Sequence, residues 1–263
     1  MYLKPNWRVL TIGDGDLTFS YSLKKYHSLQ SVTASVLDDK KTLTEKYLKN
    51  GVAGLEAFNS DIIYQLDVTN RTTWPARLNG QFDLVIFQFP LVPAAKNYNE
   101  YQQGMNQNLV NRHLLYRYLR ACFSTFLDPN GVRLAYITSK EVKPYSHWQI
   151  ETDLTLNSDI TYIGKQSFIY ADFPEYQIRN VDRDKQVKDT KGFIYAYSDK
   201  KANDEIEQSF SAFKYSRENH CPLCRVGPFT SEENKERHLL SRKHQKLAGY
   251  QKDWFEFLKG IEN

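Results

Sequence analysis

The chain has 263 residues, of which 41% are hydrophobic, 14% aromatic and 25% charged. This length suits one α/β domain of about 200 residues and a small additional module, and the composition excludes a disordered or fibrous chain. The net charge of +4, from 35 basic and 31 acidic residues, is too small to establish a nucleic-acid partner by itself. The longest apolar runs, such as residues 84–87, are too short to span a membrane, so we expect no membrane partner.

The cysteine count and the first residues of the chain bear on its compartment. The residues from Met1 to Pro5 lead almost directly into a β-prone segment and lack the pattern of a signal peptide. Three cysteines without an export signal do not form a disulfide framework. We therefore expect an intracellular location, either cytoplasmic or, in a eukaryote, nucleolar.

Strand-like and helix-like segments alternate along the first 200 residues. We expect strands at 7–12, 31–37, 62–66, 82–87 and 132–137, and helices at 19–26, 40–50 and about 106–127. Gly51 is expected to end the second of these helices. Two more β-prone segments, 161–169 and 192–197, have no long helix between them, which favours an antiparallel hairpin at one edge. Strands separated by helices predict a mostly parallel sheet that is covered on both faces.

Two glycines follow the first strand, in the run Gly13-Asp14-Gly15-Asp16. Ligands bind at the carboxyl ends of parallel strands, and glycines there let the backbone approach a ligand closely. A dinucleotide fingerprint requires a third glycine at position 18, where this chain has Thr18. The pattern therefore favours S-adenosylmethionine, which has no phosphate, over a nicotinamide dinucleotide. An ordinary tight turn remains the alternative.

Acidic residues also follow the second and third strands. Asp38 lies where a carboxylate can accept hydrogen bonds from ribose hydroxyls, and Asp67 where an adenine amino group can be read. Each residue alone is also typical of a surface acid or a helix cap. Together, the strand ends predict a cofactor site formed by Gly13, Asp14, Gly15, Asp38 and Asp67.

Several motifs occur in the order found in one known family. Residues 13–20 (GDGDLTFS) resemble its G-E-G-(D/N)-F-S-F-S motif, and residues 82–90 (FDLVIFQFP) resemble F-D-x-I-x-F-N-F-P-H. Residues 144–148 and 173–176 are similar to P-Y-x-x-W and Y-P-G-Y. The chain thus resembles, over residues 7–198, the 25S ribosomal RNA (uridine-N3) methyltransferases. This resemblance implies a Rossmann-like class I methyltransferase fold, S-adenosylmethionine as cofactor and ribosomal RNA as substrate.

The chain departs from this family where the RNA base is expected. Gln88 replaces the usual asparagine, Leu91 stands where a histidine is common, and the basic tail after the last motif is reduced to residues 177–180. Cofactor binding is therefore better supported than catalysis on uridine. The alternative is a catalytically inactive RNA-binding or assembly protein with the same fold.

Methylation of uridine at N3 requires the N3 proton to leave, and positioning supplies much of the acceleration. In the loop Gln88-Phe89-Pro90, the amide can bond to a base edge, the ring can stack on the base and the proline stiffens the backbone. Packing of Phe89 into the core is the alternative. Asp14 and Asp16 are candidates for the general base by proximity only.

A few other residues of the main domain receive structural interpretations or none. Tyr145 and Trp148 are expected either to line the substrate cleft or to cap the sheet. Cys122 lies on an apolar helical face, which predicts a buried thiol. The sequence assigns no role to three histidines, at positions 27, 113 and 147.

The strongest local pattern lies near the C-terminus. Cys221 and Cys224 are followed after thirteen residues by His238 and after five more by His244. A Cys-x2-Cys knuckle and a His-x5-His helix supply four ligands for tetrahedral zinc, and so short a module folds only with its metal. We expect its small core to contain Phe229 and a leucine at 239 or 240. The adjacent His220 does not fit the spacing.

The long His-x5-His gap and the segment 241–246 resemble the matrin-type class of zinc finger, which implies contacts with double-stranded RNA or with protein. Positive charge near the helix suits phosphate contacts. It comes from Lys235, Arg237, Arg242, Lys243 and Lys246. A solvated basic helix that docks on protein is the alternative. The aromatic segment 250–258 is expected to pack on the finger or the main domain, or to contact a protein partner.

The sequence therefore predicts two regions. Residues 1–200 form a Rossmann-like α/β domain that binds S-adenosylmethionine, and residues 201–263 form a linker, a Cys2His2 zinc finger at about 218–248 and a C-terminal helix. The first hypothesis for function is methylation of a base nitrogen, uridine N3, in structured ribosomal RNA, with the finger aiding RNA binding.

Overall fold

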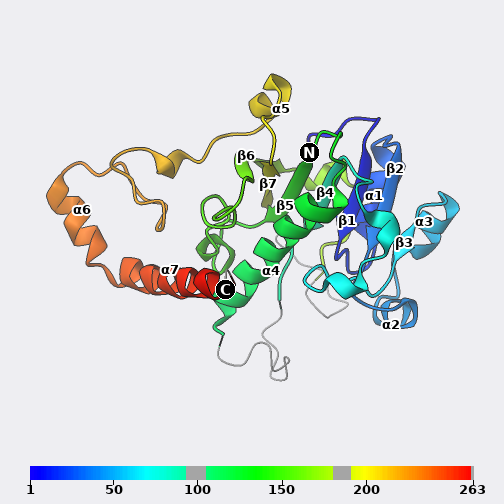
Figure 1. Cartoon of the computed structure of the whole chain (residues 1–263), viewed down its shortest axis with the longest axis horizontal. Coiled ribbons are helices and arrows are strands. Elements are labelled where there is room, and N and C mark those ends of the chain that lie inside the picture. Colours follow the sequence, from blue (N-terminus) through cyan, green and yellow to red (C-terminus); the bar gives the residue numbers. More distant parts are fainter. Residues whose placement is uncertain (93–104, 180–190, 262–263) are drawn as a thin grey trace.

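A computed structural model describes residues 1–92, 105–179 and 191–261 of the chain. Within these residues, one sheet has the strand order β3-β2-β1-β4-β5-β7-β6 (Figure 1). The strands are β1 (Arg8–Ile12), β2 (Ser31–Ser35), β3 (Ile62–Ile63), β4 (Leu84–Gln88), β5 (Leu134–Ser139), β6 (Thr161–Phe168) and β7 (Gly192–Ser198).

Strands β1 to β5 are parallel, and β7 runs antiparallel to both β5 and β6. This order is that of the class I methyltransferase fold, which confirms the predicted fold class. The predicted edge hairpin is also confirmed, although β7 lies beside β5 and only β6 forms the edge. The strand order reverses between β1 and β4, and a crevice for a ligand opens at such a point.

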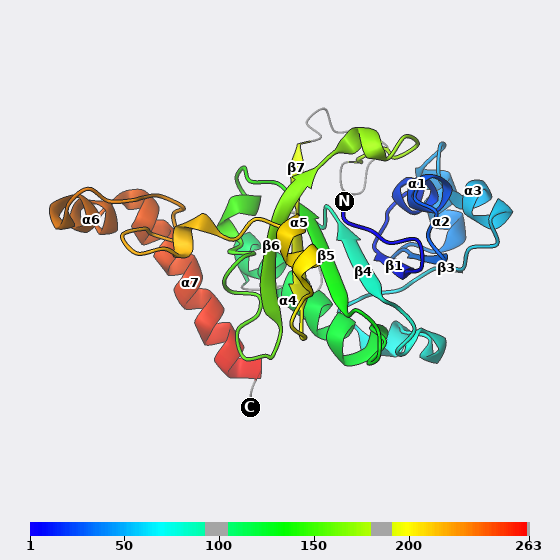
Figure 2. The same ribbon diagram turned by 90° about the horizontal axis from the view of Figure 1, so that it is seen from above.

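The helices occupy the faces and one end of the sheet. They are α1 (Thr18–Tyr26), α2 (Lys40–Lys46), α3 (Val52–Ala57), α4 (Gln107–Ala121), α5 (Asp204–Ser209), α6 (Glu232–Leu239) and α7 (Arg242–Ile261). Figure 2 shows α1, α2 and α3 near one end of the sheet and α6 and α7 beyond the other. Among the described residues, no helix is long and apolar enough to cross a membrane.

The predicted helix over 40–50 is wrong in its second half. Helix α2 ends at Lys46, and Gly51 precedes α3 instead of ending α2. The Gly51 N–H donates to the carbonyl oxygen of Asp16, and a Cβ at Gly51 would lie 2.1 Å from the Leu17 carbonyl oxygen. This close approach to the β1–α1 turn requires a glycine and redirects the chain.

The third predicted strand is shorter than expected. Only Ile62 and Ile63 pair with β2. The chain then leaves the sheet at Gln65, which adopts a left-handed conformation with φ of 58°.

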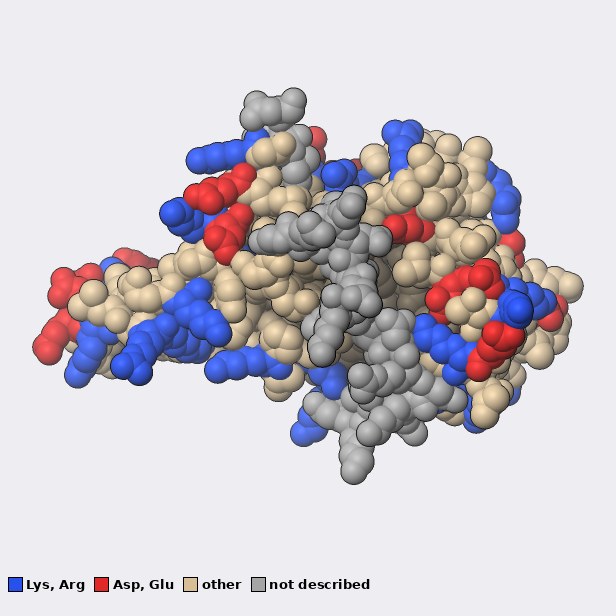
Figure 3. Space-filling model, turned by 90° about the horizontal axis from the view of Figure 1, so that it is seen from below, with Lys and Arg blue, Asp and Glu red and all other residues tan. Residues whose placement is uncertain are grey.

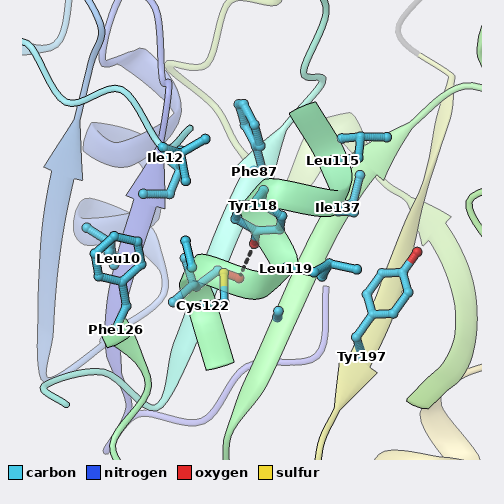
Figure 4. Packing of buried hydrophobic residues seen from close by; sticks show 14 of the residues in the cluster. Leu10, Ile12, Phe87, Leu115, Tyr118, Leu119, Cys122, Phe126, Ile137 and Tyr197 are labelled. Carbon is cyan, nitrogen blue, oxygen red and sulfur yellow. Dashed lines mark hydrogen bonds between the residues drawn. The ribbon is translucent and has the colours of Figure 1, made fainter. Parts of the chain in front are cut away.

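One face of the sheet packs against α4, as Figure 4 shows. Tyr118 of α4 is fully buried, and its hydroxyl donates to the carbonyl oxygens of Val85 and Tyr136 in two neighbouring strands. Cys122 lies beside it at the end of the helix, and burial raises the pKa of its thiol, which confirms the predicted core thiol. Trp148 is buried in the same cluster and therefore covers the sheet.

The opposite face is covered by α1 and by residues that follow β7. Phe19 and Leu23 of α1 share one buried cluster with Ile206 and Phe210, which lie in and just after α5. The backbone of Ser211 pairs with that of Lys165 in β6. The predicted boundary at residue 200 stays a prediction, and the packing on the sheet continues as far as residue 211.

The C-terminal helix packs on the main domain through α4, as one of the sequence alternatives expected. Trp254 of α7 is fully buried, and its ring lies edge-on to Tyr116 with a centroid distance of 5.5 Å. The Asp253 carboxylate accepts a hydrogen bond of 2.7 Å from the Asn106 amide. Apolar packing and a polar contact therefore join α7 to the same helix that covers the sheet.

The substitution Trp254→Ala tests this packing. It removes a large buried ring, and we expect the free energy of unfolding to fall by about 3–5 kcal/mol. The control is Phe255→Ala on the same helix, where the native side chain is 43% exposed, and a change within about 0.5 kcal/mol is expected. Urea denaturation followed by circular dichroism measures both. Equal losses would contradict the docking of α7 on α4.

Candidate functional site

A cavity of about 390 Å³ opens at the carboxyl ends of β1, β2 and β4. Such a volume lies within the range of small-molecule and cofactor sites. All eight residues that the sequence proposed for cofactor and catalysis line it: Gly13, Asp14, Gly15, Asp38, Asp67, Gln88, Phe89 and Pro90. Tertiary structure thus brings together residues that are separated by up to about 75 positions in the chain.

Gly13 begins the turn after β1 in a conformation that favours glycine. Its φ is 62°, and a Cβ there would lie 2.8 Å from the Cε2 atom of Phe87. A side chain would therefore be strained by the backbone and would also collide with β4. The resulting turn places the backbone of residues 13–15 directly on the cavity wall.

Two buried acids complete the turn. Asp14 accepts hydrogen bonds from the backbone N–H and the hydroxyl of Ser20, at 2.7 and 2.5 Å. Asp16 accepts from Thr18 and forms an ion pair of 2.7 Å with the guanidinium of Arg179. Burial, followed by the nearby carboxylate of Asp16, raises the pKa of Asp14. Asp14 therefore retains its proton to a higher pH than an exposed carboxyl group.

Asp38 and Asp67 reach the cavity from the next two strand ends. Asp38 forms an ion pair of 3.0 Å with Lys46 of α2. One carboxylate oxygen of Asp67 accepts from the backbone N–H and the hydroxyl of Thr69, at 2.8 and 2.7 Å. Both acids are half-buried, so a ligand in the cavity can reach them.

Gln88 is a buried polar residue of the cavity whose amide lacks ordinary hydrogen bonds to the described residues. Its side chain is 93% buried, and neither atom of its carboxamide has a partner at ordinary hydrogen-bond distance among the described residues. The Tyr176 hydroxyl is its polar neighbour, and the amide acts to lower the pKa of Tyr176, which burial raises. Because a buried amide without partners costs about 1–3 kcal/mol, this geometry fits a ligand that would bond to it.

The next residue, Phe89, has a strained backbone with φ of 48°. Its half-buried ring lies edge-on to Phe168 at a centroid distance of 5.5 Å, and a Cβ at Gly192 would lie 2.7 Å from it. The ring thus packs against β6 and β7 while lining the cavity, which fits the sequence alternative of core packing. Its role as a stacking platform stays a prediction.

Sequence reasoning did not predict four of the residues that line the cavity. Tyr176 ends the last family motif, and Ile178 and Arg179 follow it. His113 of α4 was assigned no role but lines the opposite side. The family motif near 173–176 was the one signal for the first three, while nothing in the local sequence distinguished His113. Of the altered tail 177–180, residue 180 lies outside the described residues.

His113 connects the cavity with the C-terminal helix. Its Nε2 accepts a hydrogen bond of 3.0 Å from Arg117, and its ring lies edge-on to Phe257 of α7 with a centroid distance of 4.7 Å. Burial, and then the positive charge of Arg117, lower the pKa of His113 to about 4. The imidazole is therefore neutral at physiological pH, with its proton on Nδ1.

The second candidate site is the predicted zinc centre. The ligand atoms of Cys221, Cys224, His238 and His244 all lie within 4.8 Å of one another. The Nδ1 atom of His244 lies 3.5 and 3.6 Å from the two sulfur atoms. Tetrahedral zinc, with bonds of about 2.3 Å to sulfur and 2.0 Å to nitrogen, separates its ligands by about 3.5 Å.

Two further observations fit a metal at this cluster. The Nε2 atom of His238 is buried without a hydrogen-bond partner among the described residues. Burial and the neighbouring Cys221 raise the pKa of the Cys224 thiol to about 12, although the Lys243 ammonium acts to lower it, and a bound zinc ion would favour the thiolate. Zinc would be held by two thiolates and two imidazoles, a ligand set typical of structural sites.

The structure corrects two details of the finger. The histidines do not share a helix, because His238 lies in the last turn of α6 and His244 in the first turn of α7. The leucines at 239 and 240 are exposed and form no core, whereas Leu247 is buried beside the two cysteines. The break between α6 and α7 turns the chain, so that a residue of the second helix fills the place expected for one of the first.

The finger is docked on the main domain. Arg225, which follows the second cysteine, forms ion pairs of 2.6 Å with Glu151 and 3.2 Å with Glu141. The Gln149 amide donates a hydrogen bond of 2.9 Å to the carbonyl oxygen of Leu223 within the knuckle. Since Glu151 is almost fully buried, these contacts fix the finger against the loop that follows β5.

Comparisons with known proteins identify the family. The family model described as BMT5-like, rRNA (uridine-N3-)-methyltransferase BTM5-like, matches residues 10–180, more than half of the chain. The chain belongs to this family. The match contains the glycine turn, both strand-end acids and the loop at Gln88.

A plant protein is similar to this chain over part of its length. Heavy metal-associated isoprenylated plant protein 41 of Arabidopsis thaliana is 25% identical over 182 residues, which are 67% of this chain and 33% of the plant protein. The chain therefore matches about a third of that relative.

Among solved structures, the 30S ribosomal A1408 methyltransferase from an uncultured bacterium is 14% identical, with a TM-score of 0.43 over 74% of this chain and 88% of that one. TYW2 of M. jannaschii, solved in complex with AdoMet, is 14% identical, with a TM-score of 0.38 over 74% of this chain and 68% of that one.

The pH dependence of stability tests the environment of His113. Its pKa in the folded chain, about 4, lies below the ordinary value of 6.5, so the unfolded chain binds a proton first as the pH falls. We expect this group to remove at most about 3 kcal/mol from the free energy of unfolding between pH 7 and pH 4. Denaturation at several pH values should show a shallower dependence for His113→Asn. An unchanged dependence would contradict the buried neutral imidazole.

Metal analysis tests the zinc centre. We expect the purified chain to contain one equivalent of zinc by mass spectrometry of the metal, and Cys224→Ser to lose it with the structure of the finger. The matched control is His220→Ala, since His220 adjoins the cluster without belonging to it. Full zinc content in Cys224→Ser, or its loss in His220→Ala, would contradict the assigned ligands.

Proposed function

We propose that this chain is an S-adenosylmethionine-dependent RNA methyltransferase that acts on a base nitrogen, uridine N3, of ribosomal RNA. The observation that carries the proposal is the buried amide of Gln88, which has no hydrogen-bond partner within the described ranges, in a cavity that also contains the glycine turn and two strand-end acids. Family membership supports the same reaction. A cofactor nucleoside would contact the glycine turn and the strand-end acids, and an acceptor base would contact Gln88.

The cofactor would lie along the carboxyl ends of β1 to β3. The backbone of Gly13 and Gly15 would contact its methionine part, Asp38 its ribose hydroxyls and Asp67 its adenine. Lys46 now neutralises Asp38 and would have to share that carboxylate with the ribose. When bound, the cofactor supplies an electrophilic methyl group on a sulfonium centre.

The acceptor base would lie at the loop after β4. Gln88 can donate to a carbonyl of uracil with its amide nitrogen and accept with its oxygen, so one side chain can orient the base edge. Pro90 is buried and stiffens the loop, while Phe89 bounds it on the side of β6. Holding the base in line with the methyl group supplies the entropic part of catalysis.

The proton on uridine N3 must leave as the N3–carbon bond forms and the carbon–sulfur bond breaks. Asp16 is engaged by Arg179 and Thr18, which disfavours it as the acceptor of this proton. Asp14 lines the cavity and has a raised pKa, so of the two acids it is the better suited to take the proton.

Zinc would have a structural role in this proposal. The Cys2His2 cluster has no vacant ligand position for a substrate, because its four side chains complete a tetrahedral set. The finger and its basic helices would then help to hold the RNA. A protein partner of the finger or of α7 remains a separate hypothesis.

Calorimetry with S-adenosylmethionine tests the cofactor site. We expect Asp38→Asn to weaken binding by about tenfold to a hundredfold, since charge-assisted hydrogen bonds contribute about 1.5–3 kcal/mol. Asp39→Asn is the matched control, because Asp39 is the adjacent acid and caps α2 outside the cavity. Equal affinities in the two variants would contradict the assignment of Asp38.

Transfer of a radiolabelled methyl group to total RNA tests catalysis. We expect Gln88→Ala to reduce transfer by about a hundredfold or more while S-adenosylmethionine affinity changes by less than about threefold. Nucleoside analysis of the labelled RNA identifies the modified base. A wild-type chain that binds both cofactor and RNA but transfers no methyl group would support the alternative of a catalytically inactive RNA-binding protein, which the replacements at Gln88 and Leu91 motivate.

A further inference from the structure

The main domain adds to the positive charge of the finger at one place on the surface. Lys143, in the loop after β5, and Lys243 and Lys246, in the first turns of α7, are all exposed. Among the described residues, none of these three lysines forms an ion pair with a carboxylate. Their charges are therefore available to a polyanion.

Aromatic side chains connect these lysines. The Lys246 ammonium lies 5.7 Å from the centroid of the Tyr250 ring, and that ring lies 6.3 Å from the ring of His147. The Lys243 ammonium donates a hydrogen bond of 3.1 Å to the carbonyl oxygen of Cys224. After burial, the charges of Lys143, Lys246 and Lys243 all contribute to the lowered pKa of His147, so the three lysines lie within electrostatic range of one imidazole.

Helix α4 connects this surface with the cavity. The carbonyl oxygen of His147 accepts hydrogen bonds of 2.9 Å from both Asn108 and Arg112 of α4. Val110 and His113 of the same helix line the cavity. Figure 1 shows the end of α7 near the start of α4, whereas Lys243 and Lys246 lie in the first turns of α7. The lysine surface therefore reaches the cavity wall through His147 and α4.

The other basic residues of the finger are placed differently. Lys235 forms an ion pair of 3.0 Å with Glu232, and Arg237 bonds to the Asn234 amide oxygen on the same helix. Figure 3 shows Lys and Arg gathered over the region of α6 and α7, with acidic side chains at its outer tip. The five basic residues predicted from the sequence thus divide into two on α6 that bond to neighbours on their own helix and three on α7 without an ion pair among the described residues.

We propose that Lys143, Lys243 and Lys246, with Tyr250 of α7 beside His147 of the main domain, form one continuous surface that binds the phosphates of structured RNA and leads its backbone from the finger to the cavity. This inference rests on the proposed function. Exposed lysines around an aromatic ring suit a polyanion with stackable bases, and charge complementarity commits the surface to RNA. Because Arg225 fixes the finger, the lysines of the two regions keep one geometry.

The test uses the full chain and a fluorescein-labelled RNA hairpin, with binding followed by fluorescence anisotropy. Loss of one phosphate contact weakens binding by about eightfold at 0.1 M salt, so we expect the double variant Lys143→Ala, Lys246→Ala to bind about 60-fold more weakly. The slope of log affinity against log salt should become shallower by about 2. The matched control is Lys235→Ala, Arg237→Ala, which removes two charges from α6 and should bind within about threefold of the wild type.

Three outcomes would contradict the proposed RNA-binding surface: no binding of the hairpin by the wild-type chain, unchanged binding in the first double variant, or equal weakening of binding in the two double variants. Calorimetry with S-adenosylmethionine on each variant separates this result from the proposed function, since neither pair of residues lines the cavity. Cofactor binding without the expected RNA pattern would reject the surface alone. The expected RNA pattern without cofactor binding would reject the methyltransferase proposal and leave the surface supported.

Discussion

The left-handed turn at Gly13 is the constraint on which the cofactor cavity depends. It brings the backbone of the β1–α1 segment against Phe87 of β4, where a Cβ would lie only 2.8 Å from the ring. Since β1 and β4 lie on the two sides of the reversal in strand order, this contact places both strand ends around one crevice. The glycine turn and the loop at Gln88 then face a common ligand site, although they lie far apart in the sequence.

The cavity contains buried polar groups whose charge or hydrogen-bonding capacity is only partly satisfied. Asp14 and Asp16 are both nearly inaccessible to solvent, and only Asp16 has a cation, Arg179, beside it. At the start of α1, the hydroxyl of Thr18 donates a hydrogen bond to Asp16 and the hydroxyl of Ser20 donates one to Asp14. Gln88 adds a buried amide without a partner. Buried groups of this kind reduce the stability of the empty fold, and a ligand that satisfies them recovers that free energy on binding.

The C-terminal region is joined to the cavity by direct contacts. Arg225 places the cysteine knuckle against buried Glu151, and Trp254 places α7 against Tyr116 of α4. The ring of Phe257 in α7 contacts His113, and His113 also lines the cavity. The Cys2His2 cluster includes His244 in the first turn of α7, so the cluster and α7 are parts of one docked unit. The finger is therefore a fixed element of the fold.

Local sequence patterns were enough to predict the alternation of strands and helices, the glycine turn with its strand-end acids, and the four residues of the Cys2His2 cluster. Each of these predictions rests on local chemistry: hydrophobic periodicity, backbone freedom at glycine and ligand spacing. Contacts in the folded chain were needed to find the early end of α2 at Lys46, the place of β7 beside β5, the position of His113 at the cavity and the division of the basic residues into two groups. These depend on contacts between segments far apart in the chain, such as Gly51 with Leu17 and His147 with α4, and no local pattern contains such contacts.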